Sequence, residues 1–376
     1  MASELLTEFT YDHLEPLAVG AGILGTGGGG SPFHNQVYLG MRLRSGDTIP
    51  VTQVRDLPDS ALVASTGGVG APTVGVERLK QGEELYRALL ALERYSNQSA
   101  THMISAEIGG GNAISPLIVA HQAGIGIVDG DGMGRAFPEL QMDTYMIYGI
   151  PPTPVGVSDV RGHTAVFDNL ESANDLERYV RTLTVQMGGG AGMTGPLMGG
   201  ADIRRVAISG TLSFAVALGA AVIDARAHHE NPVDAIIHQS GGQMLLEGKI
   251  TDVERKFVAG FARGSLTIEG MNGYDGQSYT IEFQNENLIV VDNSGQTICS
   301  VPDLICIVET ETGESVATES LRYGLRVSVI GIPAPHLIAT PEALEVVGPA
   351  AFGYHDIEYQ PLPGTYGGAL AELLTR

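Results

Sequence analysis

Two carboxylates and an arginine follow an apolar, strand-like run near residue 130. Residues 125–128 are apolar, and they lead into Asp129, Asp131 and Arg135, with glycines between them. A carboxylate at the end of a strand can serve as a general base or a metal ligand, and an arginine there can position an anionic substrate. We therefore predict catalytic roles for Asp129 and Asp131 and a substrate-binding role for Arg135. The alternative is ordinary turn carboxylates and a surface ion pair.

Glycine-rich stretches follow two other predicted strands, 61–65 and 102–106, and a predicted helix over 13–24. Ligands bind beyond the carboxyl ends of strands in open α/β sheets, so we expect these stretches to converge on one crevice. Tight turns and close helix–sheet packing are the alternative. Glu107, at the end of strand 102–106, is a third predicted catalytic carboxylate. The predicted substrate-binding residues here are Gly28, Gly29, Gly30, Ser31, Gly67, Gly68, Gly110, Gly111 and Asn112.

A nucleotide site has weaker support. The stretch 25–30 formally matches G-x-G-x-x-G, but it follows a helical pattern and not a strand, and no GxxxxGK[ST] occurs. A nucleotide-dependent enzyme would be stabilised thermally by nucleotides.

The ten histidines contain no HxH or HExxH pattern. His34 follows the first glycine stretch, and His163 lies in Val-Arg-Gly-His-Thr; each can complete a metal site with Asp131 if the fold brings them together. We predict His34, Asp131 and His163 as metal ligands. Solvated or capping histidines are the alternative.

Composition limits the possible partners. The chain has 376 residues, with 43 acidic and 21 basic side chains and a net charge of −22, which disfavours nucleic acid and anionic membranes. Its two cysteines form no CxxC motif, and the first residues lack a basic leader, so we expect a cytoplasmic protein. The uncharged run 206–223 is predicted to be a buried helix and not a membrane span.

The order of periodic segments predicts an α/β fold. Strand 102–106, a helix capped by Asn112 and strand 125–128 fit a parallel βαβ crossover. A helix over 174–187 is followed by a flexible glycine segment, 188–196. Further helices are predicted from Asn231-Pro232, from Thr251-x-x-Glu254 and from Thr340-Pro341. Short strands are predicted at 265–269, 278–284, 287–292, 303–309 and 325–332.

These elements predict an N-terminal α/β domain with a mostly parallel sheet and Gly-rich strand exits, and a β-rich C-terminal domain. The predicted ranges are 1–165 with a helical segment 166–263, followed by 264–376.

Several motifs resemble one family along nearly the whole chain. They are Gly25-Thr-Gly-Gly-Gly-Gly-Ser-Pro, Glu107-Ile-Gly-Gly-Gly-Asn-Ala, Asp129-Gly-Asp-Gly-Met-Gly-Arg-Ala-Phe-Pro-Glu, Gly324-Leu-Arg-Val-Ser-Val-Ile-Gly-Ile-Pro-Ala-Pro and Val347-Gly-Pro-Ala-Ala-Phe-Gly-Tyr. Together they resemble the S-methyl thiohydantoin desulfurase family.

The resemblance implies two domains, zinc, and hydrolysis of a C–S bond in a thiohydantoin ring, which gives a hydantoin and sulfide or a thiol. The expected substrate is a small cyclic thioimide or imide, and we expect a homo-oligomer. The alternative is a non-catalytic partner or regulatory subunit of a hydantoinase-type enzyme, which binds a small ligand without turning it over.

Overall fold

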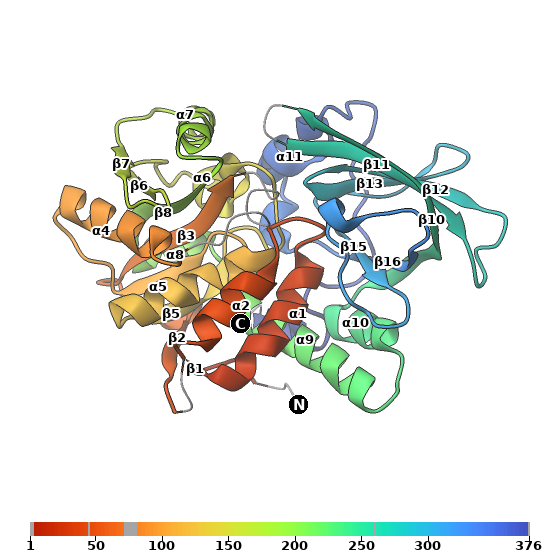
Figure 1. Ribbon diagram of the computed structural model, residues 1–376, viewed down its shortest axis with the longest axis horizontal. Helices are drawn as coiled ribbons and strands as arrows, with labels where there is room; N and C mark the ends of the chain where they lie inside the picture. Colours follow the sequence, from red (N-terminus) through yellow and green to blue (C-terminus); the bar gives the residue numbers. More distant parts are fainter. Residues whose placement is uncertain (1–3, 44–45, 71–80, 259–260, 375–376) are drawn as a thin grey trace.

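Two β-sheets with helices packed between and around them form the molecule (Figure 1). The computed structural model describes residues 4–43, 46–70, 81–258 and 261–374. One sheet is mixed and the other is antiparallel. This arrangement confirms the predicted fold class, an α/β domain joined to a β-rich part.

The centre of the first sheet is parallel. Its four central strands lie in the order β2 (Ile49–Gln53), β5 (Gly126–Asp131), β4 (His102–Ser105) and β3 (Leu62–Gly70). Strand β4, helix α5 (Ser115–Ala123) and β5 form the predicted crossover, with β4 and β5 parallel. Two short strands, β1 (Glu8–Phe9) and β9 (Ile208–Ser209), add antiparallel pairs to β2 and β5.

Beyond β3, the sheet continues with three antiparallel strands. They are β8 (Gly190–Gly199), β6 (Val155–Ser158) and β7 (Thr164–Phe167). The flexible segment predicted at 188–196 is therefore mostly strand, because it pairs with the glycine-rich half of β3, where Gly68 lies opposite Gly192. A Cβ on Gly192 would lie 2.7 Å from the backbone of helix α4 (Glu84–Ser96), so glycine here lets the helix approach the sheet.

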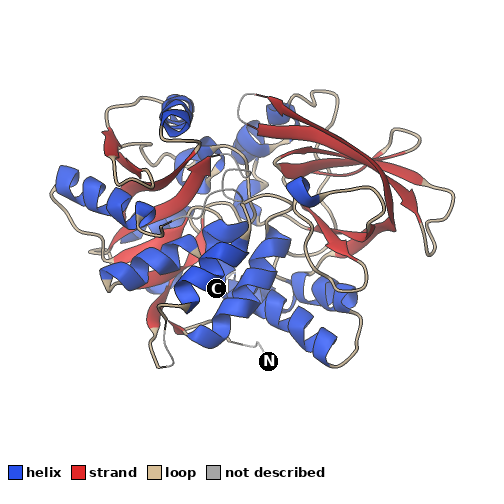
Figure 2. Ribbon diagram, in the orientation of Figure 1, coloured by secondary structure: helices blue, strands red, loops and turns tan. Residues whose placement is uncertain are grey.

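Two helices, α1 (Leu14–Leu24) and α9 (Thr211–Ala227), pack closely between the sheets (Figure 2). A Cβ on Gly20 would lie 1.8 Å from the Ala215 carbonyl oxygen, so glycine allows the two backbones to meet. One hydrophobic cluster includes α1, α9, Ile127 of the first sheet and Ile330 of the second. Most of the uncharged run 206–223 is thus a buried helix, as predicted. Within the described ranges, no helix combines the length and hydropathy needed to cross a bilayer.

The second sheet is antiparallel and has the order β14-β13-β12-β11-β10-β16-β15. The five predicted strands are present, and a long strand, β10, precedes them. The helix predicted at Thr251 and Glu254 is wrong, because both residues lie in β10, where Glu254 pairs with Ser265 of β11 and Thr251 lies at a β-bulge. The strands are β10 (Gln243–Val258), β11 (Phe261–Gly270), β12 (Ser278–Gln284), β13 (Glu286–Asp292), β14 (Thr297–Ser300), β15 (Leu304–Glu309) and β16 (Arg326–Ile332).

Local capping signals predicted two helices correctly. The Asn231 side chain accepts from the Val233 N–H at 2.9 Å at the start of α10 (Pro232–Ser240), and Thr340 accepts from the Ala343 N–H at 3.1 Å at the start of α11 (Pro341–Val347).

The remaining helices are α2 (Pro32–Gly40), α6 (Thr144–Ile147), α7 (Ala173–Gln186), α8 (Gly200–Val206) and α12 (Ala371–Leu374). The 3₁₀ turns are η1 (Tyr11–His13), η2 (Val54–Asp56), η3 (Gly110–Ala113), η4 (Leu140–Met142), η5 (Thr318–Ser320), η6 (His336–Ile338), η7 (Pro349–Phe352) and η8 (Gly368–Leu370).

Candidate active site

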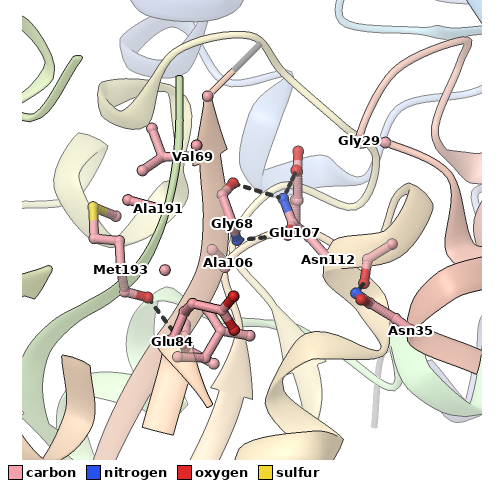
Figure 3. Close-up of a pocket in the computed structure, with 18 of the residues that line it drawn as sticks. Gly29, Asn35, Gly68, Val69, Glu84, Ala106, Glu107, Asn112, Ala191 and Met193 are labelled. Atoms are coloured by element: carbon pink, nitrogen blue, oxygen red, sulfur yellow. Dashed lines mark hydrogen bonds between the residues drawn. The ribbon is translucent and has the colours of Figure 1, made fainter. Parts of the chain in front are cut away.

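A pocket of about 650 Å³ lies where the glycine-rich stretches meet the second sheet. Most of the glycines predicted to bind substrate line it, together with Ser31, His34 and Asn112. Gly29, Gly68 and Asn112 can be followed in Figure 3. The predicted convergence of these stretches on one crevice is therefore present. Gly28 and Gly110 lie behind the lining. The β12–β13 hairpin of the second sheet contributes Asn285, from its turn, and Glu286, the first residue of β13.

The first glycine stretch, residues 25–30, and the third, residues 109–112, contact each other through their backbones. The Gly111 N–H points at the carbonyl oxygens of Gly29, at 3.0 Å, and Gly30, at 2.9 Å. A Cβ on Gly29 would lie 2.4 Å from the Gly109 carbonyl oxygen, and Gly29 has a φ of +73°. Side chains would separate the two segments, so glycine is needed here for close packing.

Asn112 connects the second glycine stretch, residues 67–70, to Glu107. Its Nδ2 donates to Glu107 Oε1 at 2.6 Å, and its Oδ1 accepts from the Gly68 N–H at 2.8 Å (Figure 3). The prediction that Asn112 caps the following helix is wrong, because Ile114 occupies the cap position of α5. The Asn112 amide instead orients the Glu107 carboxyl group on the pocket wall.

Glu107 is the predicted catalytic carboxylate that does line the pocket. Burial raises the pKa of Glu107 to about 7, although hydrogen bonds from Asn112 and from the Phe137 N–H, at 3.2 Å, favour its charged form. A carboxyl group with this pKa exchanges protons near neutral pH, as a general acid or base requires.

Glu286 is another buried carboxyl group that lines the pocket, and sequence analysis did not single it out. It is 2% exposed, and its Oε2 has no hydrogen-bond partner. Burial, with the nearby charge of Glu107, raises the pKa of Glu286 well above its usual range. The Gly29 N–H donates to it, and a Cβ on Gly28 would lie 1.9 Å from Glu286 Oε1. The first glycine stretch thus holds a carboxyl group that comes from the second sheet.

Arg135 lies behind these two carboxyl groups and is fully buried. All five of its N–H groups are used: Nε donates to Ala136 O, Nη2 to Thr26 Oγ1 and Asn287 O, and Nη1 to the carbonyl oxygens of Pro302 and Asp303. These bonds leave no N–H for a substrate, in contrast to the role predicted for Arg135. The side chain instead joins the two parts of the molecule and supplies a positive charge near Glu107 and Glu286.

Asp129 and Asp131 lie inside β5 and not beyond its end, because β9 pairs with this part of the strand. Asp129 accepts from the Ser213 N–H at 3.0 Å in the first turn of α9. Asp131 Oδ2 accepts the N–H groups of Ile108, Met133 and Gly134 at 2.8 to 3.0 Å. Neither side chain lines the pocket, so their contacts favour structural roles over the catalytic roles predicted for them.

Asp131 should make stability depend on pH. Burial raises the pKa of Asp131 to about 7, above its ordinary value of 3.8. A raised folded-state pKa gives stability that is complete below the unfolded value and is lost as pH rises through the folded value. We expect the free energy of unfolding, measured with urea from about pH 5 to about pH 8, to fall as pH rises.

Asp131→Asn should reduce that slope, because it removes one titrating group and keeps the side-chain shape. Asp252→Asn, at an exposed position in β10, is the matched control and should leave the slope unchanged. Equal slopes in Asp131→Asn and the unaltered protein would contradict the assignment.

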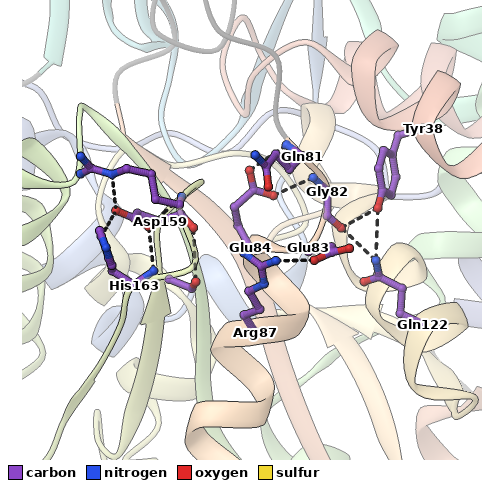
Figure 4. Close-up of polar contacts among 11 residues, drawn as sticks. Tyr38, Gln81, Gly82, Glu83, Glu84, Arg87, Gln122, Asp159 and His163 are labelled. Carbon is purple, nitrogen blue, oxygen red and sulfur yellow. Dashed lines mark hydrogen bonds and ion pairs between the residues drawn. The ribbon is translucent and has the colours of Figure 1, made fainter.

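The predicted metal ligands do not come together. His34 lines the pocket, but Asp131 and His163 do not. His163 Nδ1 lies 3.0 Å from Asp159 Oδ2, and its side chain is 69% exposed (Figure 4). Across the described part of the chain, no group of three His, Cys, Asp or Glu side chains is arranged to hold a metal ion. These donors do not fit the zinc site that the resemblance implies.

Comparison with known proteins identifies the family. The model of the S-Me-THD-like N-terminal domain matches residues 12–169, and that of the C-terminal domain matches residues 171–362. Comparison with curated proteins gave no match. The crystal structure of a protein from Chromobacterium violaceum shares the fold, with a TM-score of 0.78 and 24% sequence identity, over 95% of this chain and 100% of that one. The two family models cover nearly the whole sequence, and the chain belongs to the S-Me-THD-like family, the thiohydantoin-related family that its motifs resemble.

Proposed function

We propose that the protein hydrolyses the C–S bond of a thiohydantoin-like ring, with Glu107 as general base and Glu286 as general acid. The observation that carries this proposal is that Glu107 and Glu286, two buried carboxyl groups whose charges interact, line the same pocket; burial raises the pKa of Glu107 to about 7 and that of Glu286 well above its usual range. Two neighbouring carboxyl groups can take opposite roles in one reaction when their environments hold one charged and the other protonated. The family supplies the ring as the expected substrate.

The reaction begins when water attacks the ring carbon that carries sulfur. Glu107 takes a proton from this water as the C–O bond forms, and it passes that proton to the adjacent ring nitrogen. The C–S bond then breaks, its electron pair leaves with sulfur, and Glu286 protonates the sulfur. Glu286 regains a proton from the new hydroxyl group as the carbonyl forms. One water is consumed, and the products are a hydantoin and a thiol. With a thiocarbonyl substrate, Glu107 passes its proton to the sulfur in place of the ring nitrogen, Glu286 adds the second proton, and hydrogen sulfide leaves.

Other side chains prepare this pair for the reaction. Asn112 holds Glu107 in one orientation through its 2.6 Å hydrogen bond. The Arg135 charge behind both groups lowers the pKa of each carboxyl, which opposes the effect of burial. Because the pocket lacks a suitable set of metal ligands among the described residues, no step of this proposal passes through a metal.

The proposal predicts a bell-shaped pH dependence. We expect kcat/KM for an S-methyl thiohydantoin to rise through about pH 7 as Glu107 loses its proton, and to fall at higher pH as Glu286 loses its own. Glu286→Gln should lower the maximum by roughly 10²-fold and remove the falling limb, with the rising limb retained. Thiol release measured from about pH 5 to about pH 10 checks this. A flat wild-type profile would contradict it.

The alternative function, a subunit that binds a small ligand for a hydantoinase-type enzyme, gives a different result. The unaltered protein would then bind hydantoins and thiohydantoins in calorimetry and release no sulfide or thiol from any of them.

A further inference from the structure

Helix α2 has an unusual distribution of residues for a surface helix. Phe33, Val37 and Met41, spaced four residues apart from the start of the helix to the residue after it, are 61%, 45% and 68% exposed. Asn35, on a different side of α2, is 6% exposed. A surface helix normally buries its apolar face and exposes its polar one. Folding therefore does not explain why these three side chains are apolar.

Polar contacts fix the orientation of α2. Asn35 Nδ2 donates to the Gly111 carbonyl oxygen at 2.7 Å, next to the pocket residue Asn112. The Tyr38 hydroxyl donates to the Gly82 carbonyl oxygen at 2.8 Å, and Gln122 Nε2 donates to the same oxygen at 2.9 Å (Figure 4). Asn35 thus fixes α2 to the glycine stretch that contains Gly111, and Tyr38 fixes it to Gly82 and to Gln122 of α5, while the apolar row stays exposed.

The apolar row is part of the pocket and not an isolated surface patch. Phe33, Val37 and Met41 all line the pocket whose wall also carries Glu107 and Glu286. A pocket of about 650 Å³ has the size that holds a drug-sized molecule, so a five-membered ring at the carboxyl groups fills only part of it. The remaining space needs a ligand group whose chemistry matches an apolar wall.

We propose that the substrate is a ring with a bulky apolar substituent, and that Phe33, Val37 and Met41 bind this substituent. The inference rests on the proposed function for the position of the ring, and it adds the substrate class. Contact between an apolar substituent and these side chains removes both from water, which favours binding in proportion to the area covered. Selectivity in such a pocket grows by roughly ten-fold for each methylene group that fits.

The test compares S-methyl thiohydantoins that have hydrogen, methyl, isobutyl, benzyl or carboxymethyl at ring carbon 5. We expect kcat/KM to increase from hydrogen to benzyl and to be low for carboxymethyl. The triple variant Phe33→Ala, Val37→Ala, Met41→Ala should lose roughly ten-fold or more on the benzyl substrate and change less than about three-fold on the unsubstituted one. Because the three side chains are exposed, these substitutions should leave the fold intact.

The matched control replaces two exposed apolar side chains that are not part of the pocket lining, Val185→Ala with Tyr323→Ala, which are 64% and 70% exposed. It should keep the wild-type order of substrates. Turnover that is equal across the series would overturn the inference and leave the proposed function intact. A triple variant that changes the oligomeric mass in light scattering, with unchanged selectivity, would instead assign the row to an interface between copies.

A binding experiment tests the apolar site even if the proposed function fails. If no thiohydantoin is turned over, binding of 5-benzylhydantoin and unsubstituted hydantoin is measured by calorimetry, which needs no reaction. Tighter binding of the benzyl compound, lost in the triple variant, would still support the apolar site. Equal affinity for the two compounds would overturn it.

Discussion

Glu107→Gln is expected to reduce thiol release by roughly 10² to 10⁴-fold, the usual contribution of a general base. Glutamine keeps the size of the side chain and an oxygen for the Asn112 amide, but it cannot accept a proton from water at neutral pH. The loss should appear in kcat, with little change in the affinity for a hydantoin product. The measurement is the rate of thiol release by the purified variant, with its fold checked by circular dichroism.

Asp143→Asn is the matched control for this substitution. Asp143 is a buried carboxyl group whose pKa is also raised to about 7 by burial, but it does not line the pocket. Asparagine can still accept from the Met146 N–H, as Asp143 Oδ1 does at 2.7 Å. Activity should stay within about three-fold of wild type, since no proton transfer is assigned to this group. If both variants lose activity equally, raised pKa and burial alone do not identify the catalytic group.

Arg135→Met is expected to destabilise the protein by about 3 to 5 kcal/mol, as the loss of a buried charged partner typically does. The substitution leaves the Asn287, Pro302 and Asp303 carbonyl oxygens without this donor, and it removes the positive charge near Glu286. The measurement is the free energy of unfolding from urea titration. Arg135→Lys, which keeps the charge but has fewer donors, should fall between wild type and Arg135→Met.

Arg178→Met provides the comparison for an exposed arginine. Its side chain is 67% exposed and pairs with Asp175 at 2.8 Å, so its loss should change stability by about 1 kcal/mol or less. If Arg135→Met is no more destabilising than Arg178→Met, the buried bonds of Arg135 do not hold the two parts of the molecule together.

Local signals in the sequence predicted much of the fold. Asn231-Pro232 and Thr340-Pro341 start helices because a cap and a proline act on the next turn of the chain alone. Strand 278–284 was predicted with the bounds that the structure has, since its alternation of apolar residues reflects one buried face. Such features depend on few neighbours, so single-sequence reasoning finds them.

Features set by distant partners were predicted less well. Residues 188–196 were predicted to be flexible because of their glycines, yet most of them belong to β8, which pairs with the glycines of β3 more than a hundred residues earlier. Asp129 and Asp131 were predicted to follow the end of a strand, but pairing with β9 continues β5 as far as Asp131. Each error arose where a segment far along the chain supplied the hydrogen bonds.

The residues of the candidate site also divide into those that local sequence predicted and those that depend on distant partners. Glu107 and two of the three glycine stretches were found because they follow strands of one sheet, and the first stretch was found from its glycines after α1. Glu286 was missed because it begins β13 directly after the polar residues Gln284 and Asn285, where the sequence gives no sign of burial. It becomes a pocket residue only when the second sheet meets the first glycine stretch, a contact that no local pattern predicts.

Reaction in H₂¹⁸O tests the central claim most directly. The unaltered protein is incubated with an S-methyl thiohydantoin in this solvent, and the products are analysed by mass spectrometry. Hydrolysis at the carbon that carries sulfur predicts a hydantoin with one ¹⁸O atom and an equal amount of methanethiol, both lost in Glu107→Gln. Recovery of the intact thiohydantoin, although calorimetry shows that it binds, would contradict the account and identify a binding subunit.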